Sequence, residues 1–282
     1  MLIILFAAAI IIGIGYLLIR NKDTQKEKPL EEVFMEKETS PEVKITVVYD
    51  NNPFDERLRT GWGFGCLVET GTQTILFDTG ADAETLLSNM RVLSIDPQKI
   101  NIIVLSHIHG DHVGGLFGFL EKNSKVAVSL PSLFPQSFKD RVKSFGASIV
   151  EVSDSTSITD GVLTTGEMGT FIKEQSLVVK TEKGLIVITG CAHPGIVNIV
   201  KKAKEITDEE VFLVLGGFHL RGASNSQLRD IVKDFRLLRV QKAAPCHCSG
   251  DRCRELFKEE YEDDYIEAGV GKIIKLSRNE FR

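Results

Sequence analysis

From Val43 onward, short apolar runs alternate with polar turns along the chain. Runs of about four to eight residues that are rich in β-branched side chains and bounded by turn residues are typical of β-strands. The segment Ser155–Glu174 is rich in turn residues and holds either short strands or a loop. The predicted strands are Val43–Tyr49, Phe64–Glu69, Thr74–Phe77, Ile102–Leu105, Val126–Leu130, Ser148–Val152, Leu177–Lys180, Leu185–Thr189, Val211–Leu215, Lys242–Pro245 and Ile273–Leu276.

Other segments carry apolar residues at helical spacing. One example is Leu86, Leu87 and Met90, which follow an acidic first turn. Pro194 fits the first position of another helix, because that position needs no backbone N–H. The predicted helices are Asp82–Val92, Val113–Leu120, Ser137–Phe145, Gly195–Ile206, a helix within Ser226–Leu238, and Arg252–Glu259.

Hairpins and strand–helix units are mixed in this order of elements. The strands Leu177–Lys180 and Leu185–Thr189, for example, are predicted to form a hairpin around Gly184. A purely parallel sheet is therefore excluded. An α/β fold in which two mixed sheets pack together and helices cover both outer faces, an αββα arrangement, would accommodate this pattern.

The first apolar run differs from the others in length. Leu2–Ile19 contains no charge, and about 18 residues of helix span roughly 27 Å, enough to cross the hydrocarbon core of a bilayer. A cleaved signal peptide would have a basic stretch before the run and a small-residue cleavage site after it. Here Met1 is followed at once by apolar residues, and Arg20 and Lys22 come after the run. An uncleaved transmembrane helix is therefore favoured.

The cationic residues Arg20, Lys22, Lys26 and Lys28 follow the span, so the positive-inside rule places the rest of the chain in the cytoplasm. The segment after the span is rich in Lys and Glu and has no apolar stripe, which is typical of a solvated tether. The sequence predicts a single-pass protein of the cell membrane with a transmembrane anchor (residues 1–20), a charged linker (21–42) and a cytoplasmic domain (43–282).

Composition narrows the possible functions. The chain has 282 residues, of which 43% are hydrophobic, and its formal net charge of -5 argues against a nucleic-acid binder with a broad basic surface.

The number of cysteines is odd and three of them lie close to His247 in the sequence, which favours reduced thiols over a disulfide framework. We interpret them as small buried residues around a site rather than as a zinc knuckle, because no second pair lies upstream. They are Cys66, Cys191, Cys246, Cys248 and Cys253.

The six histidines occupy four places, and each place follows an apolar, strand-like run. Convergence at strand exits is what a metal site at one edge of a sheet requires. The segment Ser106–His112 is the densest, with imidazole and carboxylate side chains that suit zinc and its neighbours. His-x-His can direct both imidazoles at one ion, and the Asp-His pair after Gly110 can face a second ion. The histidines are His107, His109, His112, His193, His219 and His247.

The His-x-His-x-Asp-His segment resembles the signature of the metallo-β-lactamase superfamily, and the likeness extends over the chain from Val43. Phe77-Asp78-Thr79-Gly80, Gly190-Cys191-Ala192-His193-Pro194-Gly195 and Pro245-Cys246-His247-Cys248 are similar to further motifs of that superfamily. The resemblance implies its four-layer fold and a hydrolase with two metal sites. His107, His109 and His193 would hold one metal, and Asp111, His112 and His247 the other, with Asp78 orienting a ligand histidine. Diiron relatives usually carry a glutamate at the His109 position, so a zinc-type hydrolytic site is preferred.

The chain departs from that superfamily at one position. Where a metal-bridging aspartate commonly follows the strand Val211–Leu215, this chain has Gly216-Gly217-Phe218-His219. This segment is similar to the branch of dihydropterin-ribofuranosylaminobenzene phosphate synthase-like proteins. His219 is a candidate for contact with the second metal, with a substrate phosphate or with the leaving group, and for general acid catalysis. The alternative is a histidine bonded to a neighbouring carbonyl group.

The favoured function is a membrane-anchored, metal-dependent hydrolase that acts through a metal-bound hydroxide, with Asp111 and His219 as catalytic residues. One or two Zn²⁺ ions are expected, with Mn²⁺ or Fe²⁺ as alternatives. Neutral imidazole ligands leave the filled site cationic, so an anionic, phosphate-bearing small molecule is the expected substrate. Asn51 lies either near the rim of the site or in a simple turn, and Trp62 is either substrate-facing or packed. A non-catalytic sensor module and a nuclease are the alternative functions.

Overall fold

The computed structural model describes residues 43–71 and 73–276. The predicted transmembrane anchor (residues 1–20), the whole predicted linker (residues 21–42) and the last six residues of the predicted domain (277–282) lie outside the described residues. Within the described residues, no helix has both the length and the apolar character that crossing a membrane requires.

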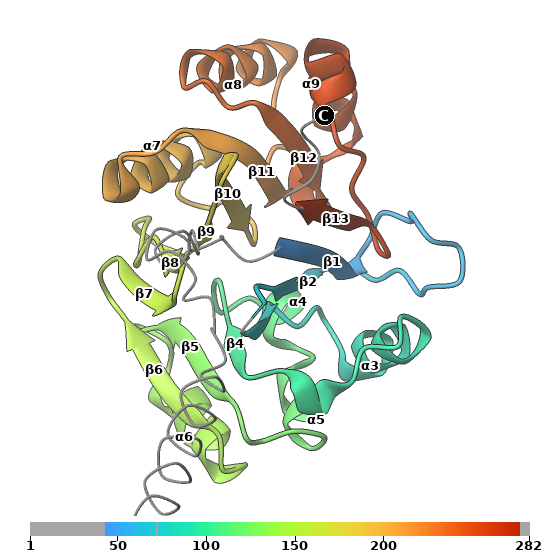
Figure 1. Cartoon of the computed structure of the whole chain (residues 1–282), viewed down its shortest axis with the longest axis vertical. Coiled ribbons are helices and arrows are strands. Elements are labelled where there is room, and N and C mark those ends of the chain that lie inside the picture. Colours follow the sequence, from blue (N-terminus) through green and yellow to red (C-terminus); the bar gives the residue numbers. More distant parts are fainter. Residues whose placement is uncertain (1–42, 72, 277–282) are drawn as a thin grey trace, which may run out of the picture. The chain divides into compact units, whose positions relative to one another are not determined.

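In the described part of the chain, the strands form two sheets (Figure 1). One sheet has seven strands in the order β13-β1-β2-β3-β4-β5-β6, and the other has six in the order β12-β11-β10-β9-β8-β7. The first consists of β1 (Val43–Asp50), β2 (Phe64–Glu69), β3 (Thr74–Phe77), β4 (Ile102–Val104), β5 (Ala127–Pro131), β6 (Ser148–Val152) and β13 (Ile273–Leu276). The second consists of β7 (Thr156–Thr159), β8 (Val162–Thr164), β9 (Leu177–Thr181), β10 (Gly184–Thr189), β11 (Val211–Gly217) and β12 (Lys242–Cys246).

Both sheets are mixed, as the sequence predicts. In the first, β13, β1, β2 and β3 pair antiparallel, whereas β3, β4, β5 and β6 run parallel. In the second, β10, β11 and β12 are parallel, and β7, β8, β9 and β10 are antiparallel. The predicted hairpin is β9–β10, in which Gly184 pairs with Thr181. Parallel strands end at the same edge of a sheet, so loops that are distant in sequence meet there.

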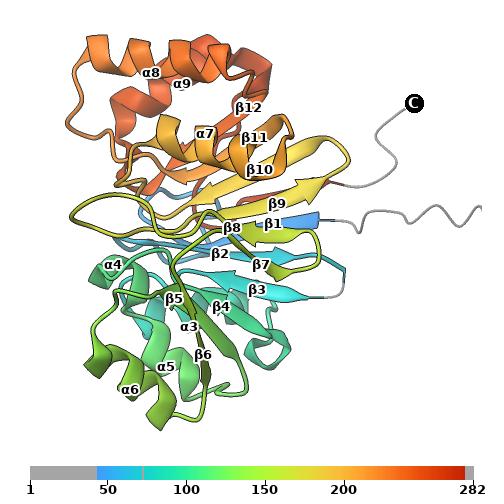
Figure 2. The ribbon, with the colours of Figure 1, turned by 90° about the vertical axis from the view of Figure 1, so that its left-hand side faces the viewer.

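Helices cover the two outer faces of the paired sheets (Figure 2). One group lies over the seven-stranded sheet and the other over the six-stranded sheet, which confirms the αββα arrangement of four layers. The first group is α3 (Ala83–Val92), α4 (Gly110–Val113), α5 (Leu116–Leu120) and α6 (Gln136–Ser144). The second is α7 (Ile196–Thr207), α8 (Asn225–Leu237) and α9 (Asp251–Tyr261), and the 3₁₀-helices are η1 (Pro97–Lys99), η2 (His247–Ser249) and η3 (Glu262–Asp264).

Strands in the middle of the fold bury both of their faces. In β10, Ile186 and Ile188 pack between the two sheets, whereas Leu185 and Val187 pack beneath the helices. Successive strand residues point to opposite faces, so a strand that is covered on both sides is apolar throughout. This explains why the sequence shows continuous apolar runs rather than alternation of apolar and polar residues.

Two predicted helix boundaries are wrong. The predicted helix Val113–Leu120 is divided into α4 and α5 by Gly114 and Gly115. These glycines pack against backbone oxygens of the loop after β3, where an added Cβ would lie 2.0 Å and 2.2 Å from the nearest oxygen. Pro194 is not the first residue of its helix, because Gly195 adopts a φ of 91° and α7 begins at Ile196.

Candidate metal centre

The four histidine-bearing segments meet at one edge of the paired sheets. His107 and His109 follow β4, and His193 follows β10. His219 and His247 follow β11 and β12. Their donor atoms form groups whose members lie within 4.8 Å of one another. The structure therefore brings together residues as distant in the sequence as His107 and His247.

One donor group consists of three histidines, His107, His109 and His193. His107 Nε2 lies 3.1 Å from His109 Nδ1, and the ring centroids of His109 and His193 are 4.9 Å apart. His193 Nε2 is buried and has no hydrogen-bond partner among the described residues. Leaving such an atom unsatisfied is costly, and a bound cation would satisfy it. The residues of this group thus fit a divalent metal.

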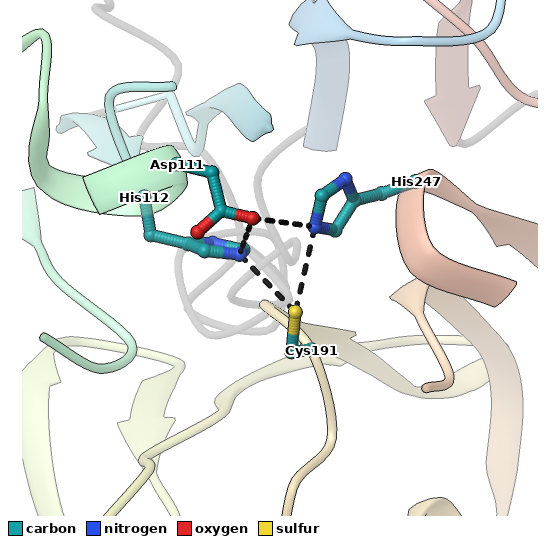
Figure 3. A group of neighbouring side chains, drawn as sticks. All are labelled: Asp111, His112, Cys191 and His247. Atoms are coloured by element: carbon teal, nitrogen blue, oxygen red, sulfur yellow. Dashed lines mark hydrogen bonds and ion pairs between the residues drawn. The ribbon is translucent and has the colours of Figure 1, made fainter. Parts of the chain in front are cut away.

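The second donor group contains Asp111, His112 and His247, the set that the superfamily resemblance implies, together with Cys191 (Figure 3). Asp111 Oδ2 lies 3.4 Å from His247 Nε2 and 3.7 Å from His112 Nε2. Figure 3 shows the four side chains pointing toward one another from α4, from the loop after β10 and from η2. A carboxylate, two imidazoles and a thiol also form a set that suits a divalent metal.

Asp78 supports one histidine of each group. Its Oδ2 lies 2.7 Å from His112 Nδ1, and its two oxygens accept hydrogen bonds from the backbone N–H and the hydroxyl of Ser106, each at 2.7 Å. Ser106 Oγ lies in turn 2.9 Å from His107 Nδ1. Contacts of this kind set the tautomer and the orientation of metal-binding histidines, which leaves Nε2 free as the donor.

Asn51 occupies the corresponding position beside His247. Its side-chain oxygen lies 2.9 Å from His247 Nδ1, and its amide donates to the His247 carbonyl oxygen at 3.3 Å. Asp50 accepts a hydrogen bond from the His247 backbone N–H at 3.2 Å. Of the two interpretations left open by the sequence, the structure therefore places Asn51 at the site. Trp62 is also near, with its ring centroid 5.1 Å from that of His247 and 46% of its surface exposed.

Glu174 is a site residue that sequence reasoning missed. It is buried, and its carboxylate accepts three backbone hydrogen bonds at 2.8–2.9 Å from the N–H groups of Cys191, Ala192 and His193. The carboxylate thus fixes the loop that contributes a residue to each donor group. Glu174 ends a turn-rich segment and belongs to no motif, so nothing in the sequence marks it.

His219 is not a member of the Asp111 group, although its donor atom lies within 4.8 Å of the sulfur of Cys191, which is. Its ring centroid is 4.4 Å from that of His193, and its donor atom groups with the sulfur atoms of Cys191 and Cys248. A hydrogen bond with Cys248 raises the pKa of His219. His219 is exposed and borders an open hollow of about 590 Å³ that extends to Ile231 on α8. It therefore lies beside the three-histidine group and lines a hollow of small-molecule size.

The protonation states of the donor groups suit metal binding. Burial and the neighbouring imidazoles hold the pKa of His107 well below its usual value, and burial and His219 lower that of His193 to about 4. Burial raises the pKa of Asp111, but the nearby His247 and His112 lower it by more. At neutral pH His107 and His193 are thus unprotonated donors and Asp111 is a carboxylate, the forms in which these side chains bind metals. Burial lowers the pKa of His112, but the Asp78 carboxylate raises it by more.

Comparison with known proteins decides the family. The family model of the metallo-beta-lactamase superfamily matches residues 66–201. The 7,8-dihydropterin-6-methyl-4-(beta-D-ribofuranosyl)-aminobenzene-5'-phosphate synthase of Methanocaldococcus jannaschii is 34% identical over 284 residues, covering 83% of this chain and 97% of the relative. The chain belongs to the metallo-beta-lactamase superfamily.

Solved structures of the superfamily agree with this assignment. A metal-dependent hydrolase of the beta-lactamase superfamily superimposes with a TM-score of 0.71 at 30% identity, covering 83% of this chain and 99% of that protein. The short form of human tRNase Z matches with a TM-score of 0.57 at 15% identity over 82% of this chain and 98% of that protein, which shows the shared fold alone. The superfamily assignment and the donor groups together support a metal-dependent enzyme.

Proposed function

We propose that this metallo-beta-lactamase superfamily protein is a metal-dependent hydrolase that acts on an anionic, phosphate-bearing small molecule. One observation carries the proposal: two metal-donor groups lie side by side at one sheet edge, with the ring centroids of His107 and His112 4.2 Å apart. When bound, divalent metals lower the pKa of a water molecule and polarise a phosphoryl or carbonyl oxygen. Zn²⁺ is the first candidate metal, and Mn²⁺ and Fe²⁺ are the others.

The protein itself supplies a prepared site. Asp78 and Ser106 hold His112 and His107 in the orientation in which Nε2 faces inward, and Glu174 holds the loop of Cys191 and His193. Because these supports are buried and hydrogen-bonded, the donors are positioned without a bound ion. A rigid, preorganised donor set is what metal-assisted catalysis requires.

The expected substrate charge follows from the donors. Five of the residues in the two groups are histidines, which bind metals as neutral imidazoles, one is a carboxylate and one is a thiol, so a centre filled with two divalent metals carries net positive charge and attracts anions. The hollow beside His219 is large enough for a small organic molecule. The M. jannaschii relative is named for a compound that carries a 5'-phosphate, which supports a phosphate-bearing substrate. We assign His219 to contact with the phosphate or the leaving group.

A second candidate function is a metal-dependent binding module without turnover. Among the described residues, no carboxylate belongs to both donor groups, and the superfamily's bridging aspartate is replaced by the segment that ends in His219. A centre without a bridging carboxylate could bind an anion and not hydrolyse it. Assays of hydrolysis and of binding separate these two functions.

We further propose that the domain is held at the membrane by residues 1–20, with its metal centre in the cytoplasm. The support is in the sequence: the uncharged run Leu2–Ile19 is followed by Arg20 and Lys22. Fractionation of cells that express the full chain, with a reporter fused to the C-terminus, tests both parts. A reporter that is active only outside the cytoplasm would contradict the orientation.

The proposed activity is tested with a panel of phosphomonoesters, phosphodiesters, lactones and thioesters in the presence of Zn²⁺ or Mn²⁺. We expect metal-dependent hydrolysis of a phosphate ester, and loss of that activity to the background rate in His107→Ala and Asp111→Asn. The exposed Asp140→Asn on α6 is the matched control and should retain activity. Binding of phosphate compounds without any turnover would favour the binding module instead.

A further inference from the structure

Cys191 and Cys248 differ from the other cysteines in what surrounds them. Within the described residues, Cys66 and Cys246 pack in the apolar cluster between the sheets, and Cys253 packs in the cluster beneath α7, α8 and α9. Neither Cys191 nor Cys248 belongs to these apolar clusters, and the sulfur atoms of both lie in groups of metal donors. All five cysteines are buried and reduced, as the sequence predicts, and Cys191 and Cys248 are the two whose sulfur atoms lie among the metal donors of the described residues.

The Cys191 sulfur faces two nitrogen atoms rather than carbon atoms. It lies 3.3 Å from His112 Nε2 and 3.4 Å from His247 Nε2, the same two atoms that face Asp111 Oδ2 (Figure 3). Four donors from three segments of the chain thus converge on one small space. Glu174 holds the backbone N–H of Cys191 at 2.9 Å, so the sulfur is placed there by the protein.

The separations between these donors are those of a tetrahedral metal site. Zinc bonds of about 2.0–2.1 Å to nitrogen and oxygen and about 2.3 Å to sulfur give tetrahedral separations of about 3.3–3.4 Å between nitrogen and oxygen and about 3.5–3.6 Å between nitrogen and sulfur. The observed nitrogen–sulfur separations are 3.3 and 3.4 Å, and the nitrogen–oxygen separations are 3.4 and 3.7 Å. All four lie within about 0.3 Å of the tetrahedral values for the same pair of elements.

At the end of β11, a glycine leaves room for the loop that carries Cys191 and for the thiol of Cys248. Gly217 stands where the strand leaves the sheet, and an added Cβ there would lie 2.3 Å from the Gly190 carbonyl oxygen and 2.7 Å from the Cys248 sulfur. A side chain at this position would displace the loop that carries Cys191. The glycine at 217 and the thiol at 191 are thus structurally coupled.

We propose that Cys191 is a metal ligand, the fourth protein donor of the site formed by Asp111, His112 and His247, and that it takes the place of the missing bridging aspartate in that site. The thiol loses its proton to solvent when the sulfur–metal bond forms, and no electrons are transferred. Thiolate sulfur selects Zn²⁺, Co²⁺ and Cd²⁺ over Mg²⁺ and Mn²⁺. This inference rests on the proposed metal-dependent function.

A set of four protein donors at one metal site affects which of the two sites can bind the substrate. Zinc sites with four protein ligands are closed and structural, whereas catalytic sites have three protein ligands and one open position. The His107, His109 and His193 group has three protein donors. Substrate is therefore expected to meet the metal of the three-histidine site, which is also the site that His219 adjoins.

The test uses the full chain loaded with Co²⁺, whose bond to thiolate sulfur gives a charge-transfer absorption that imidazole and carboxylate do not give. We expect this absorption in the wild type, and we expect its loss in Cys191→Ser, with the Co²⁺ content lowered or the remaining Co²⁺ bound without sulfur. Cys253→Ser is the matched control and should keep the absorption. Cys248→Ser distinguishes the group of Asp111, His112 and His247 from the group of Cys191, His219 and Cys248, and it should also keep the absorption. Cys191→Ala is the second variant, and circular dichroism of each variant establishes that it is folded.

Two results would overturn the inference. One is a wild-type protein that binds Co²⁺ without the charge-transfer absorption. The other is an absorption that persists in Cys191→Ser or disappears only in Cys248→Ser. The measurement needs no substrate, so it is separable from the proposed function: an intact absorption without hydrolysis of any phosphate ester would contradict the hydrolase and leave the cysteine ligand standing.

Discussion

Replacing Asp78 with Asn should weaken metal binding through the change of a single atom. Asp78 is fully buried, and its Oδ2 contacts both the Ser106 hydroxyl and His112 Nδ1 at 2.7 Å. In Asp78→Asn the amide NH₂ takes the place of that oxygen and presents a donor to His112 Nδ1. His112 must then carry its proton on Nε2, the atom that faces Asp111 and the metal position. If the side-chain amide in Asp78→Asn rotates by 180°, its NH₂ instead faces the backbone N–H of Ser106, and two hydrogen-bond donors then oppose each other.

The expected loss follows from the position of Asp78 behind the donor. Removing the partner of a metal-binding histidine typically costs about 10- to 100-fold in metal affinity, which corresponds to about 1.4–2.8 kcal/mol. The three-histidine group should lose less, because Asp78 reaches His107 only through Ser106 Oγ, 2.9 Å from His107 Nδ1. The two sites should therefore separate in affinity, with the Asp111 group the weaker.

Competitive titration of metal-free protein with Zn²⁺ against a chromophoric chelator measures both affinities. Asp140→Asn, an exposed carboxylate on α6, provides the control for the loss of one charge. Thermal unfolding of the metal-free variants separates an effect on binding from an effect on folding. Two unchanged affinities in a folded Asp78→Asn would refute the claim that Asp78 sets the donor state of His112.

Four further outcomes are expected. Glu174→Gln removes an acceptor for the N–H groups of the Cys191–His193 loop, so it should lower Zn²⁺ affinity at both sites and the unfolding free energy by about 1–3 kcal/mol in a denaturant titration. Gly217→Ala should lower the free energy of unfolding by about 1–3 kcal/mol through overpacking. Gly222→Ala should lower it far less, because an added Cβ at Gly222 has no atom within 4 Å. Equal losses in the two variants would contradict the coupling of Gly217 to its neighbours. Removal of bound metal with a chelator should lower the melting temperature, and re-addition of Zn²⁺ should restore it. The reason is that a ligand present at about 100 times its Kd stabilises the folded state by about 2.7 kcal/mol. Deletion of residues 2–19 should move the protein from the membrane pellet to the supernatant on fractionation, and an unchanged distribution would speak against the anchor.

The fold and most of the donor residues are predictable from local sequence. The β-branched runs predict the strands because a strand buried on both faces needs apolar residues throughout, as Leu185–Ile188 in β10 shows. The donors of the six-stranded sheet are predictable because β10, β11 and β12 are parallel and end at one edge, so His193, His219 and His247 must come close together. The prediction of a strand needs only the residues next to one another in the sequence, and the prediction of a donor needs only the direction of its strand.

The rest of the site depends on contacts between distant loops. Glu174 acts through three backbone N–H groups in a loop 17–19 positions away, and no side-chain pattern marks that relation. Cys191 has the burial expected of a packing residue; only the direction of its sulfur, toward His112 and His247, makes it a donor. His219 follows the predicted strand, yet its backbone φ of 56° places the ring beside His193 rather than in the Asp111 group. Such directions are decided by tertiary packing.

The central claim is that two metal sites adjoin at the edge of the paired sheets. A crystal structure of the Zn²⁺-loaded protein, with anomalous scattering recorded on both sides of the zinc absorption edge, tests it most directly. Two zinc peaks are expected, one among His107, His109 and His193 and one bonded to Asp111, His112, His247 and the Cys191 sulfur. Fully loaded crystals with no anomalous peak at either group, or with zinc bound only elsewhere on the protein, would contradict the account.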